Sequence, residues 1–311
     1  MKIKDYPVLI LAAGRGERIG KITEQNKTLI EIDKKKHIKI LDLLLFNLIS
    51  SGVRNIIIIT GYQGENIRIY LEDLILHIDS RTFFTPILSE FKATNINCIE
   101  ANSDYIRGPL YTLMTINKYR NPFFENAKPN DSYDEMVQML IFKKTLEQIK
   151  DYQLFTVIPA DTIFNIDMLQ SLFSLEFEGE NKGKDNHQIQ SSFSSTLTLS
   201  QSERFGLAAV IYKIKSGEIS FKSHGTDIDT RDIQLPIISI LPRFLDYCET
   251  LRMTEISKVV DALNEFLKID ERNSIITKYI EFKGSNPPLF DIDTKEDLLD
   301  IQDRYFSFHK L

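Results

Sequence analysis

The residues from Val8 to Asp33 read "VLILAAGRGERIGKITEQNKTLIEID" and change abruptly from an apolar run to a glycine-rich loop. The run is continuously apolar rather than alternating, which is typical of a strand buried on both faces of a sheet. Gly14 and Gly16 follow it, and glycines at such a turn let backbone N–H groups approach an anion closely. The stretch therefore predicts a buried strand followed by an anion-binding loop.

Two familiar glycine-rich patterns do not fit this loop. The dinucleotide-binding fingerprint needs a further glycine at the position of Ile19. The ATPase P-loop needs Lys-Ser or Lys-Thr after its second glycine, whereas Lys21 is followed by Ile22. An ordinary tight turn between a strand and a helix is the alternative that requires no ligand.

Length and charge limit the class of protein. The chain has 311 residues, which fits one α/β domain, and we expect a single domain over residues 1–311. The formal net charge of -6 argues against a nucleic-acid partner. Cys98 and Cys248 stand far apart, which argues against a disulfide framework or a zinc site. No apolar segment has the length of a signal peptide or a membrane span, so we expect a cytoplasmic protein.

Strand-like and helix-like segments alternate along most of the chain. This order predicts an α/β fold of three layers, with helices on both faces of a mainly parallel, twisted sheet. Residues 121–150 and 177–193 are expected to be insertions or loops, and a helix is expected within the first of them. The expected strands are 7–13, 28–33, 55–60, 95–101, 153–161, 195–200, 206–214, 219–223, 235–241 and 274–282. The other expected helices are 37–51, 64–75, 109–119, 168–175, 242–251 and 255–268, with a last one after Thr294.

The opening stretch resembles the signature of a known enzyme family, the nucleotidyltransferases that activate sugar phosphates and related phosphorylated small molecules. Gly14, Gly16 and Arg18 match its Gly-x-Gly-x-Arg core, and Lys27 matches its signature lysine. The family usually has proline before that lysine, and this chain has Asn26. The resemblance implies the Rossmann-like nucleotidyltransferase fold.

Later segments continue the resemblance at matching spacings. "IIIITGYQGENIRIYL" is similar to the second strand, Gly-Tyr turn and helix of the sugar-, inositol- and choline-phosphate branch. "NSDYIRGPLYTL" stands where the family places its nucleotide-base loop, and "FTVIPADTIFN" is similar to the strand that delivers a metal-binding aspartate. "ERFGLAAV" and "FDIDTKEDL" resemble two further motifs, the second of which combines a metal ligand with a terminal helix.

The resemblance implies roles for individual residues. Arg18 and Lys27 would be catalytic, with Arg18 holding the β- and γ-phosphates through bidentate contacts and Lys27 reaching the α-phosphate. Asn102 would read the edge of the base, and Gly108 would allow its close approach. The remaining residues implied to bind the nucleotide are Leu11, Ala12, Ala13, Gly14, Arg15, Gly16, Pro109 and Asp161.

Two aspartates are candidates for the ligands of a magnesium ion. Asp161 follows an apolar strand, and ligands collect at the carboxyl ends of strands in open α/β sheets. Asp293 precedes the last helix, and Asp291 is its rival for the same role. Mg²⁺ prefers carboxylate ligands and leaves positions for phosphate oxygens. The alternative for each aspartate is a structural role in a turn or a helix cap.

The implied reaction joins a nucleoside triphosphate to a phosphorylated acceptor, a sugar 1-phosphate or a similar ester such as an inositol or choline phosphate. An acceptor oxygen attacks the α-phosphorus, pyrophosphate leaves, and Mg²⁺ and fixed cations balance the charge. A nucleotide-sugar-dependent glycosyltransferase of related fold and a non-catalytic nucleotide-sensing domain are the alternatives. The sequence leaves the base, the acceptor and the oligomeric state open.

Overall fold

The computed structural model describes most of the chain. The described residues are 2–16, 26–120, 154–174, 192–198, 210–215, 218–222, 232–240, 242–269, 277–282, 289–299 and 301. Residues 121–150, with the helix expected there, and residues 177–191 lie outside this part. The second expected insertion ends too late, because Ser192 and Phe193 already belong to strand β8 (Ser192–Thr198).

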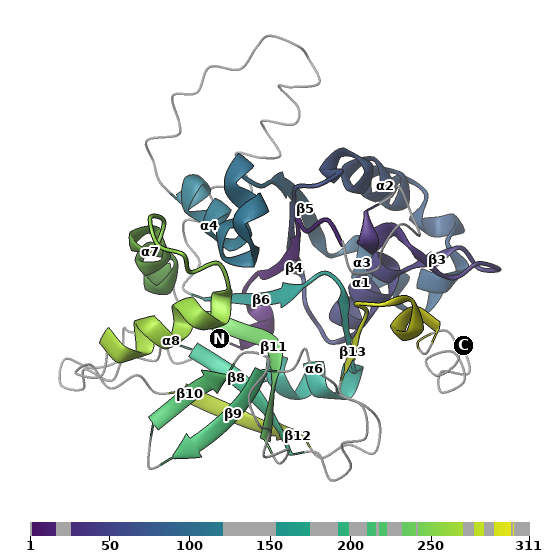
Figure 1. The fold of residues 1–311 in the computed structure, drawn as a ribbon. Helices are drawn as coiled ribbons and strands as arrows, with labels where there is room; N and C mark the ends of the chain where they lie inside the picture. The colour runs from purple at the N-terminus through teal and green to yellow at the C-terminus, as the bar shows by residue number, and fades with distance from the viewer. Residues whose placement is uncertain are drawn as a thin grey trace.

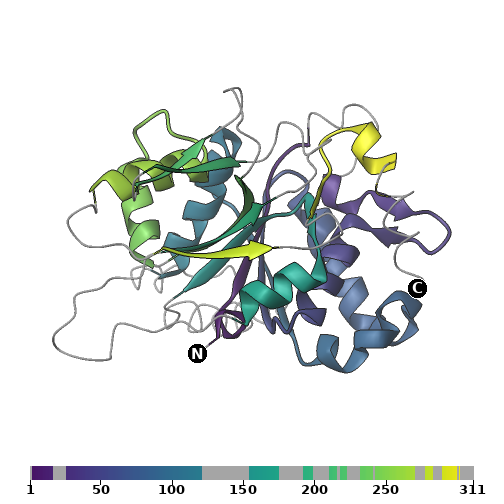
Figure 2. The same cartoon turned by 90° about the horizontal axis from the view of Figure 1, so that it is seen from below.

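The centre of the sheet is parallel, as predicted. Strands β6 (Phe155–Pro159), β1 (Val8–Ala12), β4 (Asn55–Thr60) and β5 (Asn95–Glu100) lie side by side in this order. All neighbouring pairs among them are parallel. Their carboxyl ends therefore meet at one edge, where the glycine loop also begins (Figures 1 and 2).

Antiparallel strands extend the sheet beyond β6. Strand β11 (Asp232–Ile240) pairs antiparallel with β6, β8 and β9 (Val210–Lys215). Its pairing with β8 shifts register between Gln234 and Ile238, around Pro236, which has no N–H group to donate. Strand β10 (Glu218–Lys222) pairs with β9, and β12 (Thr277–Phe282) runs parallel to β8. The described sheet is thus mixed, with the predicted parallel arrangement around β1.

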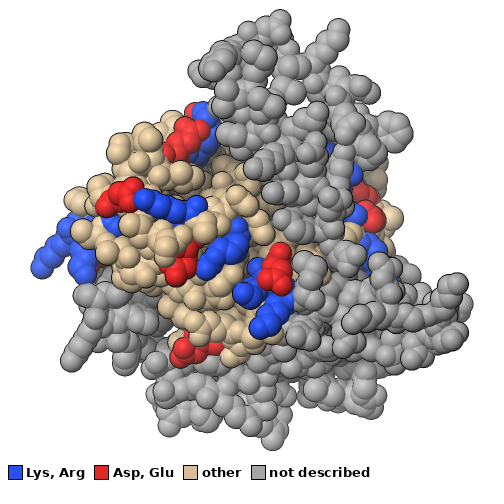
Figure 3. All heavy atoms as spheres, turned by 180° about the vertical axis from the view of Figure 1, so that it is seen from behind, with Lys and Arg blue, Asp and Glu red and all other residues tan. Residues whose placement is uncertain are grey.

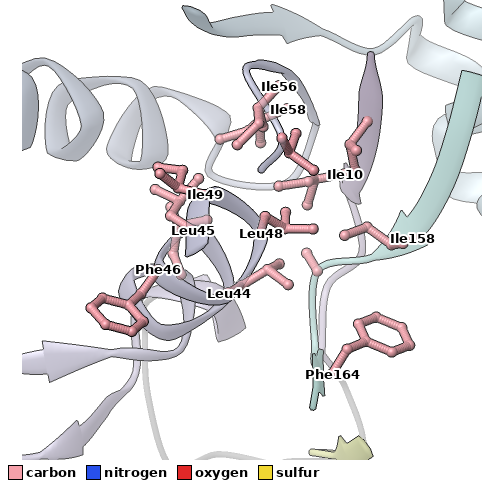
Figure 4. Close-up of a cluster of buried hydrophobic side chains, with 14 of the residues drawn as sticks. Ile10, Leu44, Leu45, Phe46, Leu48, Ile49, Ile56, Ile58, Ile158 and Phe164 are labelled. Atoms are coloured by element: carbon pink, nitrogen blue, oxygen red, sulfur yellow. The ribbon is translucent and has the colours of Figure 1, made fainter. Parts of the chain in front are cut away.

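Helices cover both faces of this sheet and complete three layers. One face is covered by α1 (Ile40–Ser50), α2 (Gly64–Leu76), α3 (Leu88–Lys92) and α6 (Ile166–Phe173). The other is covered by α4 (Pro109–Arg120), α7 (Pro242–Thr250) and α8 (Val259–Ile269). Ile10 of β1 belongs to the first core and Leu9 to the second, as expected for a strand buried on both sides. Figure 4 shows Leu44 and Leu48 of α1 beside Ile10 and Ile158.

Several short strands and 3-10 helices lie outside the main sheet and the covering helices. The hairpin of β2 (Glu31–Asp33) and β3 (Ile38–Lys39) has an exposed lysine turn, as predicted. Strand β13 (Leu289–Asp291) pairs antiparallel with β7 (Thr162–Phe164) and was not predicted. The short 3-10 helices are η1 (Ile3–Asp5), η3 (Lys27–Leu29), η4 (Ile78–Ser80), η5 (Thr82–Ile87) and η6 (Ser103–Arg107).

Two helices begin three or four residues later than predicted, and α6 begins two residues earlier, at Ile166. Helix α1 begins at Ile40 rather than at His37, because His37 has a positive φ and the next two residues pair with β2. Helix α8 begins at Val259 rather than at Glu255. The residues before it turn back on α4 instead, where the Ser257 carbonyl accepts a hydrogen bond from the Leu110 N–H group.

The described surface carries charges of both signs. On the face shown in Figure 3, Lys and Arg side chains are interspersed with Asp and Glu side chains. No helix in the described ranges combines the length and the hydrophobicity needed to cross a membrane.

Candidate active site

Lys27 brings together segments that are far apart in the chain. Its Nζ donates hydrogen bonds to Asp161 Oδ2 at 2.9 Å and to Asp293 Oδ1 at 3.0 Å. The lysine side chain is only 8% exposed. Burial disfavours the ammonium, but the contacts with Asp161 and Asp293 outweigh it and raise the pKa of Lys27. The predicted catalytic lysine and both predicted metal ligands therefore form one charged cluster.

Asn26 fixes the backbone that carries this lysine. It caps η3: its Oδ1 accepts hydrogen bonds from the Thr28 N–H at 3.0 Å and the Thr28 hydroxyl at 2.9 Å. Its Nδ2 donates to the Tyr62 carbonyl at 2.7 Å. With 1% exposure, Asn26 satisfies both ends of its amide inside the protein. An asparagine thus holds the turn at the position where the resembled family usually has proline.

The glycine loop meets the same lysine. Gly16 has φ +64°, and a Cβ added there would lie 3.0 Å from the Cβ of Lys27. Gly14 differs, because no described atom lies within 4 Å of the position its Cβ would take. Among the described residues, the loop is therefore packed against Lys27 at Gly16 and has no close neighbour at Gly14. Arg15 is exposed, with its guanidinium carbon 6.0 Å from the centre of the Tyr62 ring. Arg18 lies outside the described residues, and its role stays a prediction.

The pairing of β7 with β13 creates the acidic cluster. Asp161 lies in the turn after β6, one residue beyond Ala160, and its carbonyl accepts a hydrogen bond from the Ile292 N–H at 3.0 Å. Asp291 pairs with Thr162 in the ladder, which brings Asp291 and Asp293 to the end of β6. Ligand oxygens of Asp161, Asp291 and Asp293 all lie within 4.8 Å of one another. Asp291 and Asp293, the two rivals for the second metal position, therefore both belong to this cluster.

Asp291 lies in a largely buried site beside two other carboxylates. Burial raises the pKa of Asp291 to about 7; the charges of Asp161 and Asp293 add to the shift, and Lys27 opposes it. The Thr162 hydroxyl donates a hydrogen bond to Asp291 Oδ1 at 3.3 Å, which also favours the ionised form. A cation beside the cluster would offset this repulsion between carboxylates.

The capping box predicted at Thr294 is present. The Thr294 N–H donates to Asp297 Oδ2 at 2.7 Å, and the Asp297 N–H donates to Thr294 Oγ1 at 3.2 Å. Asp297 Oδ2 also accepts from the Asp293 N–H at 3.0 Å. The helical turn over residues 295–299 therefore fixes the backbone of Asp293 as well as its own start.

The end of β1 is packed against the predicted base loop. Gly61 lies between them, since its added Cβ would fall 2.7 Å from the Cβ of Ala13 and 2.9 Å from a ring carbon of Tyr105. The Tyr62 N–H donates to the Ala13 carbonyl, and the Ala160 N–H donates to the Leu11 carbonyl. The predicted residues Leu11, Ala12 and Ala13 thus lie between the turn after β4 and the aspartate after β6, with Ala12 paired to Thr60 in β4.

The base loop has structural features that its sequence did not reveal. Gly108 has φ +136°, and an added Cβ would lie 2.8 Å from the carbonyl oxygen of Ser257. The need for glycine at this position thus has a structural cause, separate from the predicted approach of a base. Pro109 starts α4, as expected.

Asn102 stands before η6 and lines a cavity of about 970 Å³ at the end of β5. Arg68 and Arg252 line the same cavity. They are paired with Glu65 and Asp104 respectively, which are also in its wall. The cavity therefore combines the predicted base-reading side chain with charges that already have partners.

Sequence reasoning did not identify Asn26, Gly61 and Tyr62 as residues that shape the site. A signal for Asn26 was available, because an asparagine two residues before threonine is typical of a local side-chain turn. The Gly-Tyr turn was recognised, but its contacts with Ala13 and Asn26 depend on the spatial proximity of β1 and β4.

Comparisons with known proteins place this fold. No protein-family model matches the sequence, and no curated protein matches it significantly. Among solved structures, the inositol-1-phosphate CTP transferase from T. maritima is similar with a TM-score of 0.59 and 14% identity, covering 98% of each chain. UDP-glucose pyrophosphorylase in complex with UDP-glucose has a TM-score of 0.62 and 16% identity, covering 98% of this chain and 99% of the other. The apo form of a UDP-glucose pyrophosphorylase gives 0.62 and 15%, with 97% and 98% coverage.

At these identities the similarity shows the fold. The chain has the three-layer α/β fold found in these nucleotidyltransferase structures, over nearly its full length. The predicted fold class is thereby confirmed.

Proposed function

We propose that this protein is a nucleotidyltransferase that joins a nucleoside triphosphate to a phosphorylated small molecule and releases pyrophosphate. The observation that carries the proposal is the buried Lys27, paired with Asp161 and Asp293 and packed against Gly16 of the glycine loop. The enzymes named for the similar structures act on an inositol phosphate or are nucleotide-sugar pyrophosphorylases. A sugar 1-phosphate or a similar ester is therefore the acceptor class that we propose.

Backbone and side-chain groups of this chain would bind the two phosphorylated reactants and neutralise part of their negative charge. Backbone N–H groups from Gly14 to Gly16 would cradle the triphosphate, and no described atom lies within 4 Å of the position that a Cβ at Gly14 would take. Lys27 would contact the α-phosphate, and Arg18 would contact the β- and γ-phosphates. The acceptor phosphate is already an anion, so the attack needs no side chain to remove a proton. Catalysis would rest on positioning and on cations fixed in advance.

Asp161, Asp291 and Asp293 fit the needs of a hard divalent cation. Their carboxylate oxygens converge within 4.8 Å, and Mg²⁺ prefers such oxygen ligands. We propose that these residues hold Mg²⁺, which supplies charge neutralisation at phosphate oxygens when bound. Lys27 lies on the side of the glycine loop and would orient the phosphates from there.

The nucleotide base would lie at the end of β1. Ala12 and Ala13 offer small side chains there, and the turn at Gly61 packs the base loop against Ala13. Asn102 would read the base edge; Leu11, Arg15, Gly108 and Pro109 would complete the predicted nucleotide contacts.

The experiment is a screen of the four nucleoside triphosphates against phosphorylated sugars, inositols and choline, read by pyrophosphate release. We expect release with one pair of substrates and Mg²⁺, and its loss in Asp161→Asn. Release of a nucleoside diphosphate from a nucleotide sugar would instead support a glycosyltransferase. Nucleotide binding without turnover for any acceptor would support a sensing domain.

A further inference from the structure

Lys27 neutralises part of the acidic cluster. Its Nζ bonds to one oxygen of Asp161 and one of Asp293, which are two of the three residues proposed to hold the metal. The ammonium therefore contacts one oxygen on each of two carboxylates that would also hold a divalent cation. Asp291 completes the cluster, and its charge adds to the repulsion that Lys27 offsets.

The ammonium and a divalent cation cannot share these oxygens without cost. A Mg²⁺ ion binds carboxylate oxygens at about 2.1 Å. Bound to Asp161 Oδ2, it would come within about 5 Å of Nζ, which lies 2.9 Å from that oxygen. At such distances two positive charges in a part-buried site repel each other strongly. Binding of the divalent cation would thus weaken the lysine contacts.

The Lys27 backbone is fixed, so any response falls on the side chain. Asn26 ties the turn to the Tyr62 carbonyl and to Thr28. The Cβ of Lys27 lies against Gly16, so the lysine stem stands between the acidic cluster and the glycine loop. A lysine side chain has four flexible carbons that can carry Nζ from one side to the other.

We propose that the Lys27 ammonium is the resident counter-ion of the aspartate cluster, that it gives way when a divalent cation binds, and that Asn26 is a positioning residue that confines this exchange to the side chain. The site itself rests on the proposed function, which supplies the reason for a metal there. Under that function, the Lys27 ammonium becomes available to phosphate groups when the divalent cation binds. Binding of the cation and binding of the nucleotide phosphates should therefore favour each other.

The test is a Mn²⁺ titration of the protein without nucleotide, with free Mn²⁺ measured by electron paramagnetic resonance. Lys27→Gln removes the competing charge while keeping a hydrogen-bond donor, and should bind Mn²⁺ about tenfold more tightly than the unmodified protein. Lys35→Gln removes the same charge from the exposed hairpin turn and should bind Mn²⁺ as the unmodified protein does. Unchanged or weaker binding by Lys27→Gln would overturn the exchange.

Asn26→Ser tests the anchor in a double-mutant cycle with Lys27→Gln. It should strengthen Mn²⁺ binding by a few-fold when Lys27 is present and leave it unchanged in the Lys27→Gln background. An equal effect in both backgrounds would show that Asn26 does not act through Lys27. The melting temperature gives a second readout: Mn²⁺ should raise it more in Lys27→Gln than in the unmodified protein.

These measurements do not depend on turnover. Tighter Mn²⁺ binding by Lys27→Gln in a protein that releases no pyrophosphate would support the exchange and overturn the proposed function. Pyrophosphate release by the unmodified protein, with no gain in Mn²⁺ affinity in Lys27→Gln, would support the proposed function and overturn the exchange.

Discussion

Lys27 and its aspartates are held by ion pairs between distant segments, whereas the loop from Asn102 to Pro109 combines one ion pair, between Asp104 and Arg252, with close packing at two glycines. Lys27, Asp161 and Asp293 come from three parts of the chain and meet through charge. The loop is fixed where Gly61 and Gly108 allow neighbouring atoms to approach. Charge at the Lys27 cluster suits the chemistry of phosphates, and shape at the loop from Asn102 to Pro109 suits the selection of a base. The two regions should therefore respond differently to substitution.

The largest effect on turnover is expected for substitutions in the cluster of Lys27 and its aspartates. Lys27→Ala should lower turnover by about a hundredfold or more, because it removes a cation fixed in advance beside the reacting phosphates. Asp161→Asn should have a similar effect and should change the dependence of turnover on Mg²⁺. Pyrophosphate release measured against Mg²⁺ concentration checks both variants. Turnover near that of the unmodified protein in Lys27→Ala would remove this residue from the mechanism.

A smaller effect of the same kind is expected for Asn26→Ala. Loss of the hydrogen bonds to Tyr62 and Thr28 should lower kcat by about tenfold, with a much smaller change in KM for the triphosphate. Thr28→Val is the matched control, since it removes one hydrogen bond to Asn26 and leaves the Tyr62 contact in place. Equal losses in both variants would argue that the Tyr62 contact has no special part.

Gly108 and Gly14 separate structure from function. Gly108→Ala should lower the free energy of unfolding by about 2 kcal/mol, because of its positive φ and the nearby Ser257 carbonyl. Gly14→Ala should change stability by less than about 1 kcal/mol, since no described atom lies near its Cβ position. It should nevertheless lower turnover by obstructing the approach of phosphate to the backbone. Urea unfolding and pyrophosphate release measure the two effects; a stability loss in Gly14→Ala as large as that in Gly108→Ala would contradict the distinction.

The raised pKa of Asp291 predicts that the stability of the metal-free protein depends on pH. Its pKa of about 7 means that the folded protein holds a proton that the unfolded chain releases near its ordinary pKa of about 4. The contribution of this group to stability is therefore greatest at low pH, falls as the pH rises through this interval, and is level above it. Asp291→Asn should thus gain stability relative to the unmodified protein between pH 4 and 7 in urea unfolding. A stability difference that does not change with pH would show that Asp291 is ionised throughout.

The smallest effect is expected for Asn102→Ala. Loss of one base contact should raise KM for the preferred triphosphate by about fivefold and reduce discrimination among the four triphosphates. Values of kcat/KM for each triphosphate provide the measurement. A fall in kcat with unchanged discrimination would place Asn102 outside the base site.

The sequence predicted much of this arrangement because its signals are local. The continuous apolar runs before Gly14 and Asp161 predicted buried parallel strands, and both strands are present as β1 and β6. The Thr294–Asp297 capping box also needs only neighbouring residues, and it is present. The starts of α1 and α8 were wrong because pairing with β2 and contact with α4 override local helix preference there.

By itself, the sequence determined the layers of the fold, the glycine loop and the residue types of the candidate site, since periodicity and motif spacing are properties of the chain. Only the tertiary structure decided that β13 pairs with β7, that Asp291 joins Asp161 and Asp293, and that Asn26 anchors Lys27 through Tyr62. These contacts join residues separated by tens to hundreds of positions. Their existence depends on which strands are neighbours, and the apolar pattern of each strand leaves that choice open.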